Sequence, residues 1–233
     1  MSAGPAAGSS GTPFLGILML DTRFPRPPGD IGHADGWAMP LRWRRVAQAS
    51  PQRVVREGAR GLLEPFLAAA QALVAQGAAA IGTGCGFLVL HQQALQAALP
   101  VPVWSSALLL LPGLAAMRPG VITADAQALG AAHLQAAGAA PDTPVQGLAP
   151  GCAFQRTLLE DRPELDEADA RVQVLDAAAR LRARHPDCGA LVLECTNLPP
   201  HAEALRRATG LPVHDVRTLL HARWQALRAG HPL

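Results

Sequence analysis

Two cysteines occupy matching places in this sequence, each after a short apolar run. Cys195 lies in the stretch LVLECTNLPPH, between a run of strand type and two prolines that open a helix. Cys85 lies in IGTGCGF, again between an apolar run and a segment of helical type. A cysteine at the start of a helix meets unpaired backbone N–H groups, which favour its thiolate form. Each thiol is therefore a candidate acid or base.

The two cysteines belong to an internal repeat with a displacement of 110 residues. Residues 81–110 align with residues 191–220 without a gap, and both copies carry a Pro-Val pair that opens the next strand. Matching alanines and leucines carry little weight in so alanine-rich a chain, and ordinary βαβ architecture explains them. A cysteine at the same strand-to-helix junction twice is a stronger signal, and it predicts two related lobes.

Two thiols that face each other across a cleft can act as a pair. Ligands bind beyond the carboxyl ends of parallel strands, where both cysteines are expected. One thiolate can remove a proton from the carbon next to a carboxylate, while the other thiol returns one from the opposite face. Such a reaction inverts a stereocentre and requires no metal and no organic cofactor. The other two cysteines, Cys152 and Cys188, are expected to pack as small apolar side chains, and no C-x-x-C pair suggests a zinc site.

Short apolar segments alternate with alanine-rich segments of helical length. This pattern predicts the α/β class, with parallel strands buried on both faces by helices. We expect two similar parallel-sheet lobes related by pseudo-two-fold symmetry, with the active site in the cleft between them. The expected strands cover residues 14–20, 78–82, 101–104, 120–124, 190–193 and 211–214, and the expected helices cover 62–76, 87–99, 168–185, 200–209 and 217–228, with one more ending near residue 138.

The expected domain boundaries are a disordered leader over 1–13, a first lobe over 14–104 plus 216–233, and a second lobe over 105–215. Residues 21–41 form a Pro/Gly-rich loop directly after the first strand. Loops of that length inside a compact domain are usually functional or disordered, and the Trp, Phe and Met of this loop argue against disorder. We expect a lid or one wall of a pocket, with a plain insertion as the alternative.

Composition excludes several classes of protein. Hydrophobic residues make up 49% of the chain and charged residues 16%, which is typical of a globular protein. Every basic residue is arginine, so an ordinary pyridoxal-phosphate lysine and a P-loop lysine are absent. The formal net charge of +2 is too balanced for a nucleic-acid partner, and no apolar run is long enough for a membrane span. We expect a cytoplasmic protein with free thiols and a small-molecule carboxylate substrate.

The stretches LGILMLDTRFPRPPGD, TGCGF and LECTN, together with the repeat, resemble the aspartate/glutamate/hydantoin racemase superfamily, in particular its members with a PRPPGD segment. The resemblance covers nearly the whole chain after the leader. It implies a two-lobed, cofactor-independent enzyme with Cys85 and Cys195 as the catalytic acid/base pair, and a homo-oligomer as a family expectation. It also implies substrate-binding roles for Asp21 and Thr22 after the first strand, and for Thr123.

The sequence departs from the glutamate racemases beside each cysteine. Gly86 and Phe87 stand where those enzymes have Asn-Thr, and Asn197 follows the matching Cys-Thr step where they have His. These positions, with Thr196, are the expected substrate-binding residues. Glutamate specificity therefore does not carry over, and Phe87 is either a pocket wall or part of the core.

Other polar residues near the expected cleft have two interpretations each. Arg26 and Arg23 either grip a carboxylate or remain solvated. Ser105 and Ser106 either donate to a substrate carboxylate or cap a helix, and Asp215 faces the same choice.

Three further side chains are expected to support the site or the core. His91 and His201 lie well past each cysteine, so a packing role is favoured for both. Glu194 precedes the second thiol in a strand, so its side chain should point to the opposite face and support the site from behind.

We therefore expect a racemase or epimerase, an isomerase, that acts on a small carboxylate-bearing substrate of amino-acid or hydantoin type by two-cysteine proton abstraction and return. An arylmalonate-type decarboxylase or a maleate-type cis–trans isomerase of the same superfamily is the alternative. A binding protein without activity on the same scaffold is the third hypothesis, and the two thiols at matched junctions speak against it.

Overall fold

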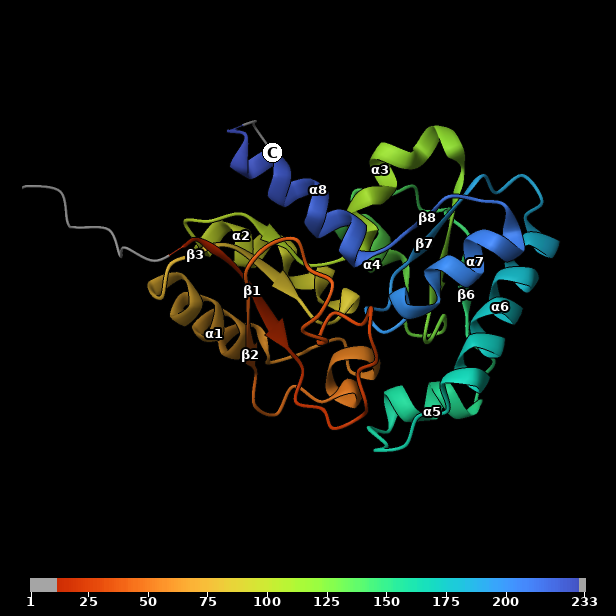
Figure 1. The fold of residues 1–233 in the computed structure, drawn as a ribbon, viewed down its shortest axis with the longest axis horizontal. Helices are drawn as coiled ribbons and strands as arrows, with labels where there is room; N and C mark the ends of the chain where they lie inside the picture. The colour runs from red at the N-terminus through yellow and green to blue at the C-terminus, as the bar shows by residue number, and fades with distance from the viewer. Residues whose placement is uncertain (1–11, 231–233) are drawn as a thin grey trace, which may run out of the picture.

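Two four-stranded parallel sheets form the framework of the protein. The computed structural model describes residues 12–230, so the leader expected over residues 1–13 lies almost entirely outside the described residues. Figure 1 shows the two sheets side by side, with helices packed around each of them. The predicted α/β class with two parallel-sheet lobes is confirmed.

The first sheet has the strand order β2-β1-β3-β4. Its strands are β1 (Phe14–Met19), β2 (Leu41–Arg45), β3 (Ala78–Thr83) and β4 (Val103–Trp104). Strand β1 is apolar and buried at every position, as expected for a central strand covered on both faces. The connecting elements are η1 (Gln52–Arg56), α1 (Leu63–Ala75), the 3₁₀ helix η2 (Gly86–His91), α2 (Gln92–Ala98), η3 (Ala107–Leu110), α3 (Leu111–Leu114) and η4 (Ala115–Met117).

The second sheet has the strand order β6-β5-β7-β8. Its strands are β5 (Pro119–Thr123), β6 (Val145–Gly147), β7 (Ala190–Leu193) and β8 (Val213–His214). Around it lie α4 (Ala131–Ala136), α5 (Ala153–Leu159), α6 (Glu167–Arg184), η5 (Pro199–His201) and α7 (Ala202–Thr209).

The two sheets have the same topology. In each, the first strand along the chain pairs with the second strand on one side and with the third on the other. Strands β3 and β7 therefore hold equivalent places, and the cysteines follow these two strands. The internal repeat of the sequence corresponds to a repeated strand arrangement.

The last helix, α8 (Val216–Arg228), packs against the first sheet. A Cβ atom on Gly82 of β3 would lie 3.3 Å from a methyl group of Leu220, and Leu219 and Trp224 belong to the same buried core. Figure 1 shows α8 in blue above the strands of the first lobe, close to the chain's end.

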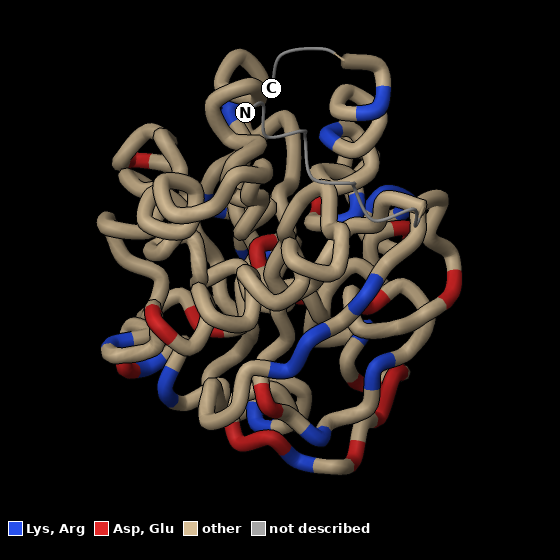
Figure 2. Tube along the Cα trace, turned by 90° about the vertical axis from the view of Figure 1, so that its left-hand side faces the viewer, with Lys and Arg blue, Asp and Glu red and all other residues tan. Residues whose placement is uncertain are grey.

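Several elements differ from the expectation. Strands β2 and β6 and helix α5 were not expected at all, and the helix expected over 87–99 is a 3₁₀ segment followed by the short helix α2. None of the helices within residues 12–230 is long and apolar enough to cross a membrane. Figure 2 shows acidic and basic residues interspersed along the chain, in keeping with the small net charge.

Candidate active site

Both predicted catalytic cysteines line one cavity at the carboxyl ends of β3 and β7. Cys85 follows β3 after Gly84, and Cys195 follows β7 after Glu194. The cavity has a volume of about 30 Å³. Its other walls include Leu20, Phe24, Arg26, Val55, Phe87, Leu158, Thr196 and Asn197. Residues of both lobes therefore surround the two thiols.

The loops that carry the cysteines are in direct contact. The hydroxyl of Thr196 donates to the carbonyl oxygen of Gly84 at 2.7 Å. Gly86 lies so close to the second lobe that a Cβ atom there would be 2.3 Å from Oε1 of Glu194. A Cβ on Gly84 would lie 2.6 Å from the sulfur of Met19. Gly86 therefore permits a close approach of the two cysteine loops that a larger residue would block, because the clash would be with the backbone of Glu194.

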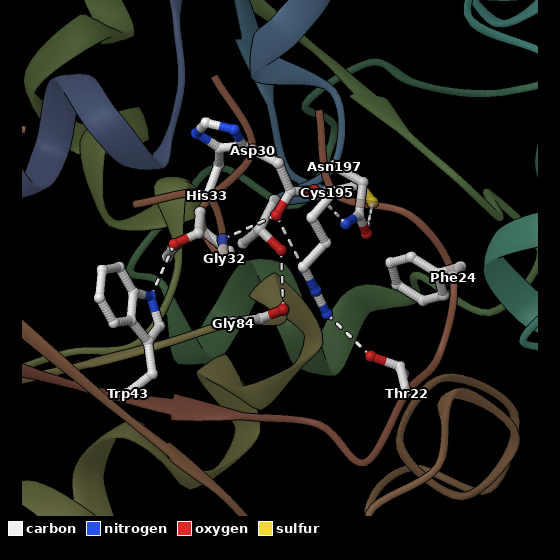
Figure 3. A network of polar contacts seen from close by, with 12 residues as sticks. Thr22, Phe24, Asp30, Gly32, His33, Trp43, Gly84, Cys195 and Asn197 are labelled. Carbon is white, nitrogen blue, oxygen red and sulfur yellow. Dashed lines mark hydrogen bonds and ion pairs between the residues drawn. The ribbon is translucent and has the colours of Figure 1, made fainter. Parts of the chain in front are cut away.

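The Pro/Gly-rich loop is joined to the second cysteine loop by a buried carboxylate. Asp30 is 1% exposed; it accepts from Nη1 of Arg26 at 2.9 Å and from Nδ2 of Asn197 at 2.6 Å. Nη2 of Arg26 donates to the hydroxyl of Thr22 at 2.9 Å. Figure 3 shows Asp30 beside Asn197 and Cys195 of the second cysteine loop, with Thr22 lower in the view. The loop is therefore one wall of the cavity, as the sequence predicted.

The Cys85 thiol has a strongly perturbed environment. Burial raises its pKa to about 12, and the negative charge of Glu194 acts in the same direction. The backbone N–H of Phe87 and the positive charge of Arg26 act in the opposite direction and favour the thiolate.

The environment of the Cys195 thiol also favours its protonated form. Burial raises its pKa well above the usual value, and the charges of Glu194 and Asp30 add to the effect. The thiol donates to Oδ1 of Asn197 at 3.5 Å, while the backbone N–H of Asn197 favours the thiolate. Of the two thiols, Cys85 has the environment better suited to a base, because a cation faces it.

Glu194 is fully buried, and its charge acts on both thiols. Burial raises the pKa of this carboxyl to about 7, and a hydrogen bond from the hydroxyl of Thr123 to Oε2, 2.6 Å long, partly offsets that effect. The sequence predicted that Glu194 supports the site from behind. In the structure Glu194 also lines the cavity itself.

The expected site residues fall into two groups. Those that line the thiol cavity are Cys85, Cys195, Arg26, Phe87, Thr196 and Asn197. Thr22, Gly86 and Thr123 support the cavity lining through the contacts described above. Ser105 is buried and donates to Oε1 of Gln92 at 2.6 Å, away from the cavity wall. Asp21 lies at the surface, where Arg45 binds it at 3.3 Å.

The remaining polar residues have structural roles. Arg23 is exposed and pairs with Asp161 at 3.3 Å. Ser106 caps η3, and Asp215 caps α8 through the N–H of Thr218 at 2.8 Å.

The other cysteines and the two matched histidines also pack. Cys152 caps α5 and Cys188 is buried. His91 contacts the carbonyl of Ala59, and His201 packs edge-on against Phe154.

Sequence reasoning missed Asp30, Phe24 and Leu158 as parts of the site. Asp30 ends the PRPPGD segment, so its motif was visible, but its partner Asn197 is 167 residues away.

A larger cavity of about 620 Å³ lies near the amino ends of β5 and β7, beside Pro119 and Cys188. Parallel sheets bind ligands at the opposite edge, so the thiol cavity is the better site. Within the described residues no cluster of three or more His, Cys, Asp or Glu side chains is placed to hold a metal ion.

Comparison with solved structures identifies the fold. Arylmalonate decarboxylase matches with a TM-score of 0.57 and 21% identity, over 93% of this chain and 92% of that one. Allantoin racemase from Pseudomonas fluorescens matches with a TM-score of 0.55 and 17% identity, over 93% and 92%. A glutamate racemase from Bacillus anthracis matches with a TM-score of 0.53 and 15% identity, over 94% and 83%. The chain therefore has the same two-lobed fold as these proteins, which is consistent with the superfamily that the sequence resembles.

Comparison with curated proteins gives a different activity from the one expected. A dimethylsulfoniopropionate lyase of Durusdinium sp. clade D is 29% identical over 86% of this chain and 70% of its own length. Dimethylsulfoniopropionate lyase 5 of Emiliania huxleyi (strain CCMP1516) is 29% identical over 90% of this chain, which spans 44% of that relative. No family model matches the sequence.

These relatives correct the functional prediction. The racemase or epimerase activity, and with it the isomerase class, is wrong, because the curated relatives are named lyases. They are not named decarboxylases or cis–trans isomerases either, so the expected alternative is not supported. The physical reason for the error is that proton removal next to a carboxylate begins both racemisation and elimination. The two thiols predict only the first step, which is removal of the proton. Whether racemisation or elimination follows depends on whether the substrate carries a leaving group.

Proposed function

We propose that this protein is a lyase that cleaves dimethylsulfoniopropionate into dimethyl sulfide and acrylate, with the Cys85 thiolate as the base. The observation that carries the proposal is that Cys85 and Cys195 line one small, largely apolar cavity. The curated relatives, 27 to 29% identical, support the choice of substrate.

The reaction needs one base. The Cys85 thiolate removes a proton from the carbon next to the substrate's carboxylate. The electron pair left behind forms the carbon–carbon double bond, while the bond to sulfur breaks with its electrons on sulfur. Dimethyl sulfide leaves as a neutral molecule and takes no proton, so the abstracted proton stays on Cys85 Sγ. Racemisation, in contrast, requires a second group that returns a proton to the same carbon.

The two thiols are therefore given different roles. Arg26 and the N–H of Phe87 favour the thiolate of Cys85, which suits a base. Cys195 donates to Asn197 and lies near the charge of Asp30, both of which favour its protonated form. We assign Cys195 the role of a hydrogen-bond donor to the substrate carboxylate, on which negative charge grows in the transition state. All four cysteines are free, and a thiolate base suits a reducing compartment such as the cytoplasm.

The walls of the cavity fit the two ends of the substrate. The Arg26 guanidinium and the Asn197 side chain are the polar groups for the carboxylate, although Arg26 is already paired with Asp30. The ring of Phe87 lines the same cavity and suits the methyl groups of a sulfonium, because aromatic faces attract organic cations. The ring of Phe24 also lines the cavity, but the Arg26 guanidinium already lies over it, 4.7 Å from its centroid.

The cavity must open before it can take this substrate. Its volume of about 30 Å³ is the space of one water molecule. Phe24 and Arg26 belong to the Pro/Gly-rich loop, which several hydrogen bonds join to the second lobe. Asp30 accepts from Asn197, the backbone N–H groups of Arg23 and Phe24 donate to Asp161, and that of Ile31 donates to the carbonyl of Thr196. Displacement of this loop is the proposed route of entry, which makes the loop a lid.

A product assay tests the proposed function. The purified protein is incubated with dimethylsulfoniopropionate, with its trimethylammonio counterpart, and with the enantiomers of aspartate and glutamate. The expected result is release of dimethyl sulfide and acrylate in equal amounts from the sulfonium alone, because a neutral sulfide is the better leaving group. Racemisation of an amino acid without any sulfide release would overturn the proposal.

A further inference from the structure

Glu194 is a buried carboxyl group that the proposed elimination does not use. Its side chain is 0% exposed, and its Oε2 accepts from the hydroxyl of Thr123 at 2.6 Å. Its Oε1 has no hydrogen-bond partner among residues 12–230. A buried polar atom without a partner costs free energy, so such an atom beside a reactive group calls for a physical reason.

The unpaired oxygen faces the loop of the first cysteine. A Cβ on Gly86, the residue after Cys85, would lie 2.3 Å from Oε1 and 2.4 Å from the backbone oxygen of Glu194. Glu194 also precedes Cys195 directly and lines the same cavity as both thiols. No other carboxyl lining that cavity is found among the described residues.

The proposed elimination requires a group that takes the proton from Cys85, and the position of Glu194 suits this role. A neutral thiol does not act as a base, and burial disfavours the thiolate of Cys85. After each turnover the thiol also carries the abstracted proton and must lose it again. An acceptor inside the site is therefore needed both before the first turnover and after every later one.

We propose that Glu194 is that acceptor: its carboxylate takes the proton of the Cys85 thiol, leaving a thiolate and a neutral carboxyl group. The proposal rests on the role of Cys85 in the proposed function. The transfer breaks the S–H bond and forms an O–H bond on Oε1, so charge and atoms balance without a further reactant. Glu194 therefore acts on the reaction only through Cys85 and does not contact the substrate.

The groups around Glu194 are compatible with one negative charge shared between Glu194 and Cys85. The two thiols face it from the cysteine loops, and the pair of Arg26 and Asp30 lies beyond them. On the β5 side Thr123 is its neighbour.

Asp125, two residues past Thr123, is already paired with Arg56 at 2.9 Å. One proton lost from this group of side chains leaves a single charge that Glu194 and Cys85 divide between them. A second loss is opposed by repulsion between like charges.

This sharing predicts an unusual pH dependence of thiol reactivity. Once one proton has left, near the Glu194 pKa of about 7, the fraction of thiolate stays constant as the pH rises further. The rate at which a small alkylating agent modifies Cys85 should therefore rise below pH 7 and level off above it. A thiol that titrates alone at its raised pKa instead gains reactivity of about tenfold per pH unit throughout this range.

The experiment measures iodoacetamide alkylation of Cys85 by peptide mass spectrometry on both sides of pH 7, in the wild type, Glu194→Gln and Thr123→Val. The wild type should show the inflection, and Glu194→Gln should lack it. Thr123→Val should keep it at a higher pH, because the hydrogen bond that stabilises the carboxylate is lost. An inflection near pH 7 that persists in Glu194→Gln, or that is absent from the wild type, would overturn the proposal.

The same experiment separates this proposal from the proposed function. Alkylation needs no substrate, so it reports on the proton acceptor even if dimethylsulfoniopropionate is not cleaved. An inflection without sulfide release would leave Glu194 as the acceptor and remove the proposed substrate. Thr123→Val is also a control for misfolding. It disturbs the same buried contact as Glu194→Gln but keeps the carboxyl group.

Discussion

The hydroxyl of Thr196 donates to the carbonyl oxygen of Gly84, so the two cysteine loops are joined across the lobes. The bond is 2.7 Å long and links residues 112 positions apart. Both groups lie directly beside a cysteine in the chain. This contact therefore sets the separation of Cys85 and Cys195 more directly than any helix or strand does.

Thr196→Val removes this contact and leaves the Gly84 carbonyl without its donor. We expect the free energy of unfolding to fall by roughly 1–3 kcal/mol, the usual cost of an unsatisfied buried polar group. We also expect kcat to fall, because the thiols lose their fixed separation. Urea denaturation and sulfide release measure the two effects. The matched control is Thr143→Val, whose hydroxyl donates at 2.7 Å in an exposed turn; equal losses in both variants would contradict this role.

Replacement of Cys195 tests its role as a donor. Cys195→Ala should lower kcat by about 10²–10³-fold, the usual loss when one donor to a growing charge is removed. Cys195→Ser keeps an O–H donor and should retain roughly tenfold more activity than the alanine variant. Cys152→Ser is the control, because that sulfur only caps α5. Equal activity of the serine and alanine variants would argue against a donor role.

Asp30→Asn removes the charge that binds Arg26 within the proposed lid and joins the lid to Asn197. We expect kcat/KM to fall roughly thirtyfold, about 2 kcal/mol, since hydrogen bonds to charged groups contribute that much. Steady-state kinetics of sulfide release measure the change. Asp187→Asn, which breaks the exposed pair with Arg118, should leave the kinetics unchanged. Wild-type kinetics in Asp30→Asn would show that the lid does not depend on this carboxylate.

Glu194→Gln should make the protein more stable at high pH. The Glu194 pKa is raised from 4.5 to about 7, so between these values the folded state holds a proton that the unfolded state has lost. Stability from this group therefore falls as the pH rises through that window and stays low above it. Above pH 7 the variant should exceed the wild type by on the order of 3 kcal/mol, and near pH 4.5 the two should agree.

Urea denaturation of both proteins at the two pH values measures this difference. A variant that is equally destabilised at both pH values would mean that the carboxyl group serves packing alone. The result bears on the proton acceptor as well, because a carboxyl that titrates near pH 7 is the group the proposed transfer needs.

The sequence predicted the strands that are buried on both faces, because their apolar runs are continuous. Strand β7 was predicted with its observed bounds, Ala190–Leu193. Strand β2 was missed because LRWRR carries three arginines and is mostly exposed at the sheet edge. Edge strands of this kind lack the apolar pattern by which buried strands are recognised, and charges there discourage pairing with other chains.

The thiol pair could be predicted because the repeat places both cysteines at the same junction. The partner of Asn197 could not, since Asp30 reaches it only after the long loop folds across the lobes. Asp21 was expected in the site and lies at the surface with Arg45, because a position after a strand does not fix the direction of a loop side chain. Local pattern thus predicts which elements end at the site, and tertiary contacts decide which loop residues enter it.

The most direct test compares the wild type with Cys85→Ala on dimethylsulfoniopropionate, with dimethyl sulfide and acrylate measured in the same sample. The expected result is equal amounts of the two products from the wild type and a rate lower by about 10³-fold or more in the variant, because a catalytic base is lost. Absence of dimethyl sulfide from the wild type, or its undiminished release by Cys85→Ala, would contradict an elimination begun by this thiolate.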